Sequence, residues 1–468
     1  MLVANRVPIV PSDSLFGGNA ASLGADGLAF YERCEALGPI VRARVFAKRI
    51  WVITGPDLVE QVLVKNTRAF IKPHVLRRLK VLFGDSLLTG DGGSWLHRRR
   101  LLQPLFHARQ TVRHAPILEK NVAALVMRIR KAAGSAIPIG ACDVHTDIVE
   151  TCIENLTESF FGVASRDLTA RIKRLATTCH VITQAMGTLR FPYYVVWPSL
   201  IERRFGRRVR LESDELLACI RDLRGAAAPG DDFLQRLAQG QDPDGCPFGA
   251  HVVQDEVVTM LLAGHETAAA AVSWALQLLA QHPDVRDELA RQIEDVCADA
   301  AVRVDDLPKI PLVEQVLLET YRLYPPTHRI GRTVVEPTSL GGAELAPGDD
   351  INIPQWAIHR SARSYDAPAE FRPERWTADF MARLPRCAFI PFSAGPRVCI
   401  GQSVVMVEDA LLIANLVHAF DFELGGAPME PVEGLTLLPG EGGRMPLRLE
   451  PRRHPVSSAP KMASGARA

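Results

Sequence analysis

The stretch FSAGPRVCIG, residues 392–401, sets one cysteine, Cys399, directly ahead of an apolar helical run. A thiolate becomes a metal ligand when its pKa is lowered, and the start of a helix supplies free N–H groups and the positive end of the dipole. Gly395 and Gly401 permit tight backbone geometry beside a flat ligand. Phe392 can shield the sulfur from water, and Arg397 can meet an anionic group. The alternative is that Cys399 is a small hydrophobic residue in a buried loop.

The spacing of these five residues decides between the two interpretations. Phe392, Gly395, Arg397, Cys399 and Gly401 match every defining position of FxxGxRxCxG, and the chain resembles the cytochrome P450 family, whose haem-binding signature this is. The resemblance implies a mainly α fold with small β-sheets and a long central helix that crosses over the haem. It also implies heme b, with Cys399 as axial thiolate of the iron and O2 as co-substrate, because thiolate donation favours O–O cleavage.

The overall charge gives no net field toward nucleic acid or an acidic membrane surface, so any charged docking face must be local. Hydrophobic residues make up 47% of the 468 residues, and 54 Lys and Arg nearly cancel 53 Asp and Glu, which argues against nucleic-acid binding. Nine cysteines without CxxC spacing suit reduced thiols in a cytoplasmic protein. The short apolar N-terminus is too brief for a membrane span. We expect one domain over residues 1–453 and a disordered tail over 454–468.

Amphipathic helical patterns dominate the chain, with short strands near both ends at residues 49–54 and 444–450. The longest pattern runs from His251 to Pro283 and would span about 45 Å as a helix. A membrane span is the alternative for this segment. Acidic residues near its start and His265-Glu266 in its middle would be costly in lipid, so we expect a central helix of the fold.

This long helix contains AGHET, residues 263–267, which resembles the oxygen-side motif of the family. The Thr267 hydroxyl can bond back to the carbonyl of Ala263 and loosen the helix for water and oxygen. Gly264 is expected to leave room above the haem face. Because oxygen activation needs protons, Glu266 and Thr267 form a sensible catalytic relay. Read alone, the motif would be an ordinary helix segment.

ETYR places Glu319 and Arg322 on one helix face, where a surface ion pair would be the ordinary interpretation. The resemblance implies instead a buried structural pair joined by a later arginine, here Arg375 in FRPERW. The three residues are expected to support the core behind the cysteine loop.

GGSWLHRRR places Trp95 and Arg99 one turn apart, so an indole N–H and a guanidinium point the same way. The resemblance assigns both to the haem propionates, together with Arg332. A solvated basic helix is the alternative. The neighbouring Arg98, Arg100 and Arg109 are expected to form a face on which an acidic electron donor docks.

The segments that line the distal pocket in the family are largely apolar here, which predicts a lipophilic substrate; a terpenoid is favoured, with a fatty acid or steroid as alternatives. His328 and Arg329 are candidate anchors for a polar group, and residues 190–200 form a candidate entrance lid with Tyr193, Tyr194 and Trp197. The predicted lining residues are Leu76, Leu88, Ala263, Thr327, Ile330 and Leu435.

The predicted activity is a monooxygenase that inserts one oxygen atom by hydroxylation or epoxidation. The cysteines lack ferredoxin spacing and no flavin segment is evident. Electrons are therefore expected from NAD(P)H through a separate ferredoxin or flavodoxin-type donor with its reductase. The protein is expected to be a monomer. A peroxide-driven peroxygenase and a haem sensor or electron carrier are the alternatives; the retained Glu266-Thr267 pair argues against both.

Overall fold

A computed structural model describes residues 7–134, 142–188, 198–225, 232–242, 245–440 and 443–452. The predicted tail over 454–468 lies outside these residues. The helices are α1 Ala20–Ala25, α2 Gly27–Leu37, α3 Pro56–Glu60, α4 His74–Arg78, α5 Lys80–Phe83, α6 Gly92–Leu102, α7 Ala108–Gly134, α8 Val144–Phe161, α9 Arg166–Thr188, α11 Pro198–Arg224, α12 Phe233–Ala238, α13 Ala250–Gln281, α14 Pro283–Cys297, α15 Pro311–Leu323, α16 Gln355–His359, α17 Ala378–Arg383 and α18 Gln402–Ala419.

The strands are short and form four small sheets. They are β1 Ile40–Val45, β2 Lys48–Ile53, β3 Phe70–Ile71, β4 Cys142–Asp143, β5 Ile330–Val334, β6 Thr338–Leu340, β7 Ala343–Leu345, β8 Asp350–Ile353, β9 Phe420–Leu424, β10 Pro431–Val432, β11 Leu438–Pro439 and β12 Pro446–Pro451. The mainly α fold with small β-sheets is therefore present, and both predicted strand segments are found, as β2 and β12.

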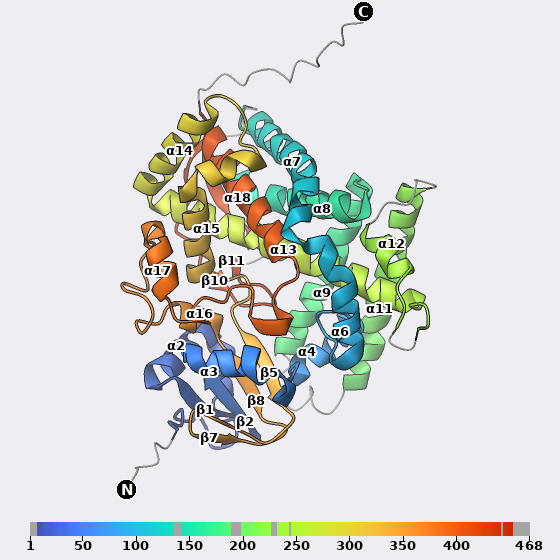
Figure 1. The fold of residues 1–468 in the computed structure, drawn as a ribbon, viewed down its shortest axis with the longest axis vertical. Coiled ribbons are helices and arrows are strands. Elements are labelled where there is room, and N and C mark those ends of the chain that lie inside the picture. Colours follow the sequence, from blue (N-terminus) through green and yellow to red (C-terminus); the bar gives the residue numbers. More distant parts are fainter. Residues whose placement is uncertain are drawn as a thin grey trace, which may run out of the picture.

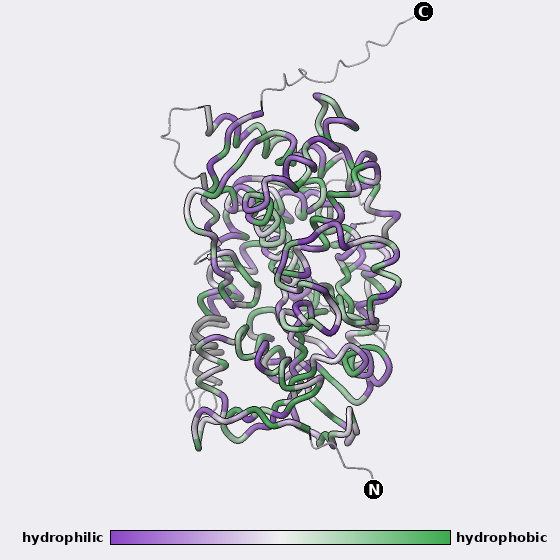
Figure 2. The backbone as a smooth tube through the Cα atoms, turned by 90° about the vertical axis from the view of Figure 1, so that its left-hand side faces the viewer, coloured by the Kyte–Doolittle hydropathy of each residue, from purple (hydrophilic) through white to green (hydrophobic). Residues whose placement is uncertain are grey.

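The strands and helices occupy different parts of the molecule. In the largest sheet the order is β1-β2-β8-β5-β3, with β2 and β8 parallel and the other pairs antiparallel. Figure 1 shows this sheet at the lower end, near the N-terminus, with α2 and α3 beside it and the long helices above. Figure 2 shows hydrophobic and hydrophilic residues interleaved along most of the backbone, as amphipathic elements require.

Helix α13 runs through the centre and joins two apolar clusters. Its first half contributes Val257, Val258, Leu261 and Leu262 to a cluster shared with α5, α6, α9, α11 and α12. The half that begins at Ala268 belongs to a second cluster, shared with α7, α8, α14, α15 and α18. The motif at 263–267 thus falls at the junction of the two clusters, where α13 has no continuous apolar packing.

Among the described residues, one helix, α18, has the length and composition of a membrane span, and 67% of it is buried inside the protein. It packs against α7, α13, α14 and α15. Its apolar character is explained by its place in the core.

Candidate active site

The cysteine loop is held by its own backbone and by a close contact with the chain near residue 63. The Cys399 N–H donates to the Phe392 carbonyl at 2.9 Å, which closes the loop. Gly395 has a φ of +71°, and a Cβ there would lie 1.9 Å from the Leu63 carbonyl oxygen. No other residue fits without moving the backbone. Phe392 packs edge-on against Tyr321 of α15, with ring centroids 5.0 Å apart.

Opposing influences act on the Cys399 thiol, and burial is the largest of them, so the net effect is a raised pKa. Burial raises the pKa of the Cys399 thiol, while the backbone N–H groups of Gly401 and Gln402 and the charge of Arg99 lower it. Cys399 is nevertheless exposed at its side chain, so its sulfur borders accessible space within the protein. An accessible sulfur with amide donors and a nearby cation has the properties of a metal ligand.

Four cationic side chains gather near this sulfur around one carboxylate. The positive charges of the cluster lower one another's pKa values, and the carboxylate of Asp91 raises them. The cations are Lys72, Arg99, Arg332 and Arg397. Burial and the neighbouring arginines lower the pKa of Lys72 to about 7 and that of Arg332 to about 10. The guanidinium of Arg99 has no hydrogen-bond or ion-pair partner among the described residues. The cluster carries more positive than negative charge, which suits an anionic ligand.

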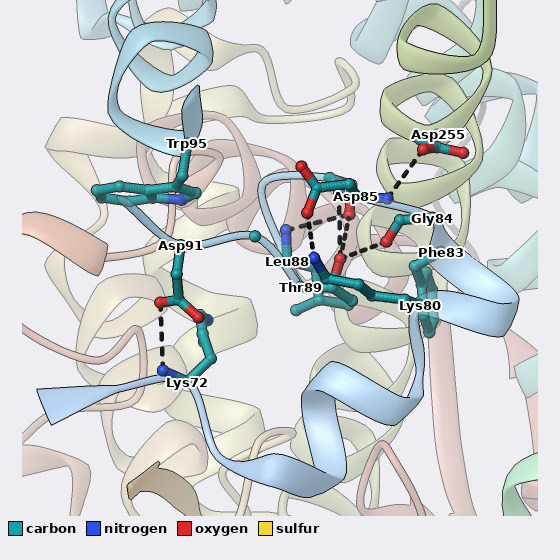
Figure 3. A network of polar contacts seen from close by, with 12 residues as sticks. Lys72, Lys80, Phe83, Gly84, Asp85, Leu88, Thr89, Asp91, Trp95 and Asp255 are labelled. Atoms are coloured by element: carbon teal, nitrogen blue, oxygen red, sulfur yellow. Dashed lines mark hydrogen bonds and ion pairs between the residues drawn. The ribbon is translucent and has the colours of Figure 1, made fainter. Parts of the chain in front are cut away.

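Asp91 organises this cluster. It pairs with Arg397 and accepts a hydrogen bond from the backbone N–H of Lys72 at 3.2 Å. Figure 3 shows Asp91 between Lys72 and the start of α6, with Trp95 above it. The sequence motifs indicate neither Lys72 nor Asp91, because both residues lie in loops that carry no motif with a characteristic spacing.

The role predicted for the Trp95 indole N–H needs correction. This N–H donates to the Leu87 carbonyl at 3.2 Å, so it is already used within the protein. The Arg397 guanidinium lies 4.0 Å from the centre of the indole ring. Trp95 therefore supports Arg397 by a cation–π contact, and Arg99 is the residue of this pair that is left for an anion.

On α13, the predicted back-bond of Thr267 is present. The Thr267 hydroxyl donates to the Ala263 carbonyl at 2.8 Å. The helix is continuous from Ala250 to Gln281, so the loosening expected from this bond stays a prediction. Ala263 is exposed although it lies mid-helix between buried residues. Gly264 was predicted to leave room above the haem face, but its missing side chain faces another helix. A Cβ at Gly264 would lie 3.1 Å from Leu156 of α8, so the glycine allows α13 and α8 to approach each other.

Glu266 is hydrogen-bonded to the C-terminal part of the chain. Its carboxylate accepts a hydrogen bond from the Thr436 hydroxyl at 2.8 Å. Glu266 also lines a small cavity with Leu435, a predicted pocket residue. The structure thus brings Leu435 and Glu266 together, and it adds Thr436, which the sequence did not indicate.

The predicted contact of Glu319, Arg322 and Arg375 is present and fully buried. Arg322 makes two hydrogen bonds of 2.8 Å to the Glu319 carboxylate, and Arg375 adds one of 3.0 Å. Both Glu319 and Arg322 have 0% exposure. Trp376 donates a further indole hydrogen bond to Glu319 at 2.9 Å. Because Tyr321 on the same helix touches Phe392, this cluster supports the cysteine loop.

Arg98 is not part of an exposed docking face, which corrects another prediction. Its guanidinium is 3% exposed and pairs with Glu256 of α13 and with Asp85, each at 3.0 Å. Arg100 and Arg109 are exposed, as expected. Neighbouring arginines in one sequence run thus point to opposite sides of α6.

Arg98 belongs to a network that attaches residues 84–90 to the start of α13. Asp255 accepts a hydrogen bond from the Asp85 N–H at 2.8 Å, and Glu256 accepts one from the Leu87 N–H at 3.1 Å. In Figure 3, Asp255 on its helix faces the turn at Gly84 and Asp85. This turn carries Leu88, one of the residues predicted to line the substrate pocket. The two adjacent acids, Asp255 and Glu256, therefore determine the position of this part of the predicted pocket wall.

We expect Glu256 to make stability depend on pH. Burial raises its pKa from 4.5 to about 7, against the hydrogen bond from Leu87 and the charge of Arg98. A raised folded-state pKa stabilises the fold below pH 4.5, and that contribution is lost as pH rises to about 7. The free energy of unfolding of wild type, relative to Glu256→Gln, should fall by about 3 kcal/mol over this range.

Urea unfolding at several pH values measures this difference. A constant difference between wild type and Glu256→Gln would contradict the expectation.

The remaining predicted pocket residues differ in their surroundings. Leu76 and Leu88 are half-buried and Thr327 is exposed, whereas Ile330 packs in the apolar core of the five-stranded sheet. His328 is 3% exposed and lies 3.5 Å from Glu433, but neither of its ring nitrogens has a hydrogen-bond partner among the described residues. Arg329 donates one hydrogen bond, to the Tyr31 hydroxyl at 3.3 Å. The candidate lid with Tyr193, Tyr194 and Trp197 lies outside the described residues.

Comparison with known proteins agrees with this site. The sequence model of the family "Cytochrome P450" matches residues 16–444. The chain belongs to the cytochrome P450 family. Cyclooctat-9-en-7-ol 5-monooxygenase of Streptomyces melanosporofaciens is 30% identical over 93% of both chains, and cyclooctatin synthase of the same organism is 27% identical over 95% of both. Pentalenene oxygenase of Streptomyces avermitilis is 26% identical over 83% of this chain and 85% of its own. The protein is thus an oxygenating oxidoreductase.

The residues of this P450 site fit a haem. Haem is a flat ring with one iron and two propionate groups, and it needs a thiolate on one side and cations at its edge. Cys399 offers the thiolate, and the surplus positive charge of Lys72, Arg99, Arg332 and Arg397 matches two carboxylates. The guanidinium of Arg99, which has no hydrogen-bond or ion-pair partner in the described part of the chain, is the strongest single indication of an anionic group at this place.

Proposed function

We propose that this P450 is a monooxygenase that inserts one oxygen atom from O2 into a terpenoid. The observation that carries the proposal is an accessible Cys399 beside the charge of Arg99, in a chain whose central helix also has the Thr267 back-bond to Ala263. Bound haem would supply the oxidising chemistry. The protein would supply the sulfur ligand, protons, substrate position and exclusion of water.

The substrate class rests on relatives and on apolar lining. The names of the three similar bacterial proteins refer to cyclooctatenol, cyclooctatin and pentalenene, and the predicted wall residues Leu76, Leu88 and Leu435 are aliphatic. His328 and Arg329 stay candidate anchors for a polar group of the substrate. The names of the relatives favour a terpenoid over a fatty acid.

Electron delivery is proposed to use a ferredoxin or flavodoxin-type donor with an NAD(P)H-dependent reductase. Arg100 and Arg109 are the exposed cations of the predicted docking face, now without Arg98. The monomeric state and the cytoplasmic location remain predictions.

Protons are proposed to reach oxygen through Glu266 and Thr267. The Thr267 hydroxyl donates into the helix, so its lone pairs are free to accept a proton that comes from the carboxyl side. We expect Thr267→Ala to keep haem and substrate binding but to release most reducing equivalents as hydrogen peroxide, because protonation is misdirected. Peroxide and product, both counted per NAD(P)H consumed, measure this. Full coupling in Thr267→Ala would reject the relay.

The function is tested by supplying the purified haem-loaded protein with a surrogate ferredoxin, its reductase, NADPH and ¹⁸O2, together with a panel of cyclic terpenoids, fatty acids and steroids. The expected result is a terpenoid product with one ¹⁸O atom. Product formed only with added hydrogen peroxide would support the peroxygenase alternative. A haem protein that oxidises nothing in the panel, with reduction by the donor intact, would favour a sensor or carrier.

A further inference from the structure

The carboxylate of Glu266 lies at the wall of a cavity between α9 and α13. The space in it that the centres of water-sized molecules can occupy is about 30 Å³. Its polar lining consists of Glu266, His265, His180 and Cys179, and its apolar lining of Phe83, Ala176, Leu262 and Leu435. About 10–15 Å³ on this measure is enough for a water molecule, which also needs polar partners to stay in a cavity. This space therefore suits water next to the Glu266 carboxylate.

Thr436 fixes the carboxylate in this position. Its hydroxyl donates to Oε2 of Glu266 at 2.8 Å, and Thr436 itself is 4% exposed, between β10 and β11. Gly434, two residues earlier, approaches His180: a Cβ there would lie 3.9 Å from the His180 ring. One turn of the chain thus touches both the acid on α13 and the histidine on α9.

We infer that Thr436 is a positioning residue that holds Glu266 toward this cavity, and that the cavity is the water-filled inlet through which Glu266 is reprotonated. The inference rests on the proposed relay. A proton would pass from solvent, past the half-buried His180, to the cavity water and then to Glu266. With one lone pair of Oε2 committed to Thr436, the rest of the carboxylate can accept from water.

Other groups at the cavity are poor substitutes for Glu266. Burial raises the pKa of the Cys179 thiol to about 12, so this thiol stays neutral. Burial lowers the pKa of His265, and its Nδ1 is engaged by the Leu261 carbonyl. The other titratable groups that act on these side chains from neighbouring elements are Glu212 and His145.

The experiment compares Thr436→Val, which keeps the shape but removes the hydroxyl, with Thr436→Ser, which restores it. In the haem-loaded protein, Thr436→Val should raise the peroxide formed per NADPH several-fold and increase the solvent deuterium isotope effect on product formation. Thr436→Ser should remain close to wild type. Thr157→Val is the matched control, since Thr157 is buried and donates to the Ile153 carbonyl of its own helix. If the serine variant behaves like the valine variant, the hydroxyl is not the cause and the inference is overturned.

Urea unfolding gives a readout apart from turnover. The stability lost in Thr436→Val should be clear in the wild-type background and much smaller in a Glu266→Ala background, where the hydroxyl has no carboxylate to bond. An equal loss of stability in both backgrounds would mean that Thr436 only packs, and would overturn the inference.

Glu266→Gln also separates the inference from the relay on which it rests. If Glu266→Gln raises peroxide formation and Thr436→Val does not, the relay stands and the role of Thr436 fails. If neither Glu266→Gln nor Thr267→Ala changes coupling, the proposed relay itself fails. If Glu266→Gln and the double variant with Thr436→Val give the same peroxide yield, the two residues act in one step, as inferred.

Discussion

Replacement of Cys399 with alanine is expected to abolish both oxygenation and the red-shifted Soret band of the dithionite-reduced protein under carbon monoxide. The loop supplies one sulfur, with the amides of Gly401 and Gln402 and the charge of Arg99 directed at it. Without that sulfur, a haem held by the cationic cluster would have lost its thiolate ligand. Absorption spectra of reduced samples, with and without carbon monoxide, measure the change.

Cys246→Ala is the matched control, because Cys246 is exposed and far along the chain from the cysteine loop. It should leave the carbonyl band unchanged. A preserved thiolate band in Cys399→Ala would assign the ligand to another cysteine. A haem that is retained with a globin-like band would show that Lys72, Arg99, Arg332 and Arg397 suffice to hold it.

Removal of the Glu319 carboxylate is expected to cost about 3–5 kcal/mol of unfolding free energy, because it leaves the buried Arg322 charge uncompensated. Arg375 and the Trp376 indole would lose the same acceptor. Urea or thermal unfolding of Glu319→Ala measures the effect. Haem content should fall as well, since α15 supports the cysteine loop through Tyr321 and Phe392.

Two further variants make this expectation testable even where Glu319→Ala does not fold. Glu319→Gln keeps the size and an acceptor oxygen, and should fold with a smaller but clear loss. Glu374→Ala breaks an exposed pair with Arg372, and should cost about 0–1 kcal/mol. Equal losses in Glu319→Gln and Glu374→Ala would show that the buried cluster is not a major source of stability.

The parts of the site that were predictable are those in which local spacing carries the geometry. Glu319 and Arg322 lie three residues apart on one helix, so their contact follows from helical periodicity. The back-bond from Thr267 to Ala263 is likewise a property of one helix turn. The Cys399 loop encodes its own turn through Gly395 and the start of α18.

The incorrect predictions concerned side chains whose partners are distant in the sequence. Arg98 and Arg99 are adjacent and chemically identical, yet Arg98 pairs with Glu256 of α13 while Arg99 faces the cysteine. The Trp95 indole N–H donates to the Leu87 carbonyl and not to the cofactor group predicted for it. The direction of each of these side chains depends on how α6 packs against α13 and against the turn at residues 84–90. The spacing of residues along α6 does not determine that packing.

The sequence by itself indicated the family, through the spacing of the cysteine loop, and the contact of Glu319 with Arg322, through the periodicity of one helix turn. The burial of that pair was expected only from the resemblance, and Cys399 as the sulfur ligand stays a prediction. Only the tertiary structure decided that Lys72 joins the cationic cluster, that Gly264 serves helix packing, and that Thr436 holds Glu266 at a cavity. Thr436 is 170 residues from Glu266. A hydrogen bond over such a separation forms only after the whole chain has packed, and no local pattern records it.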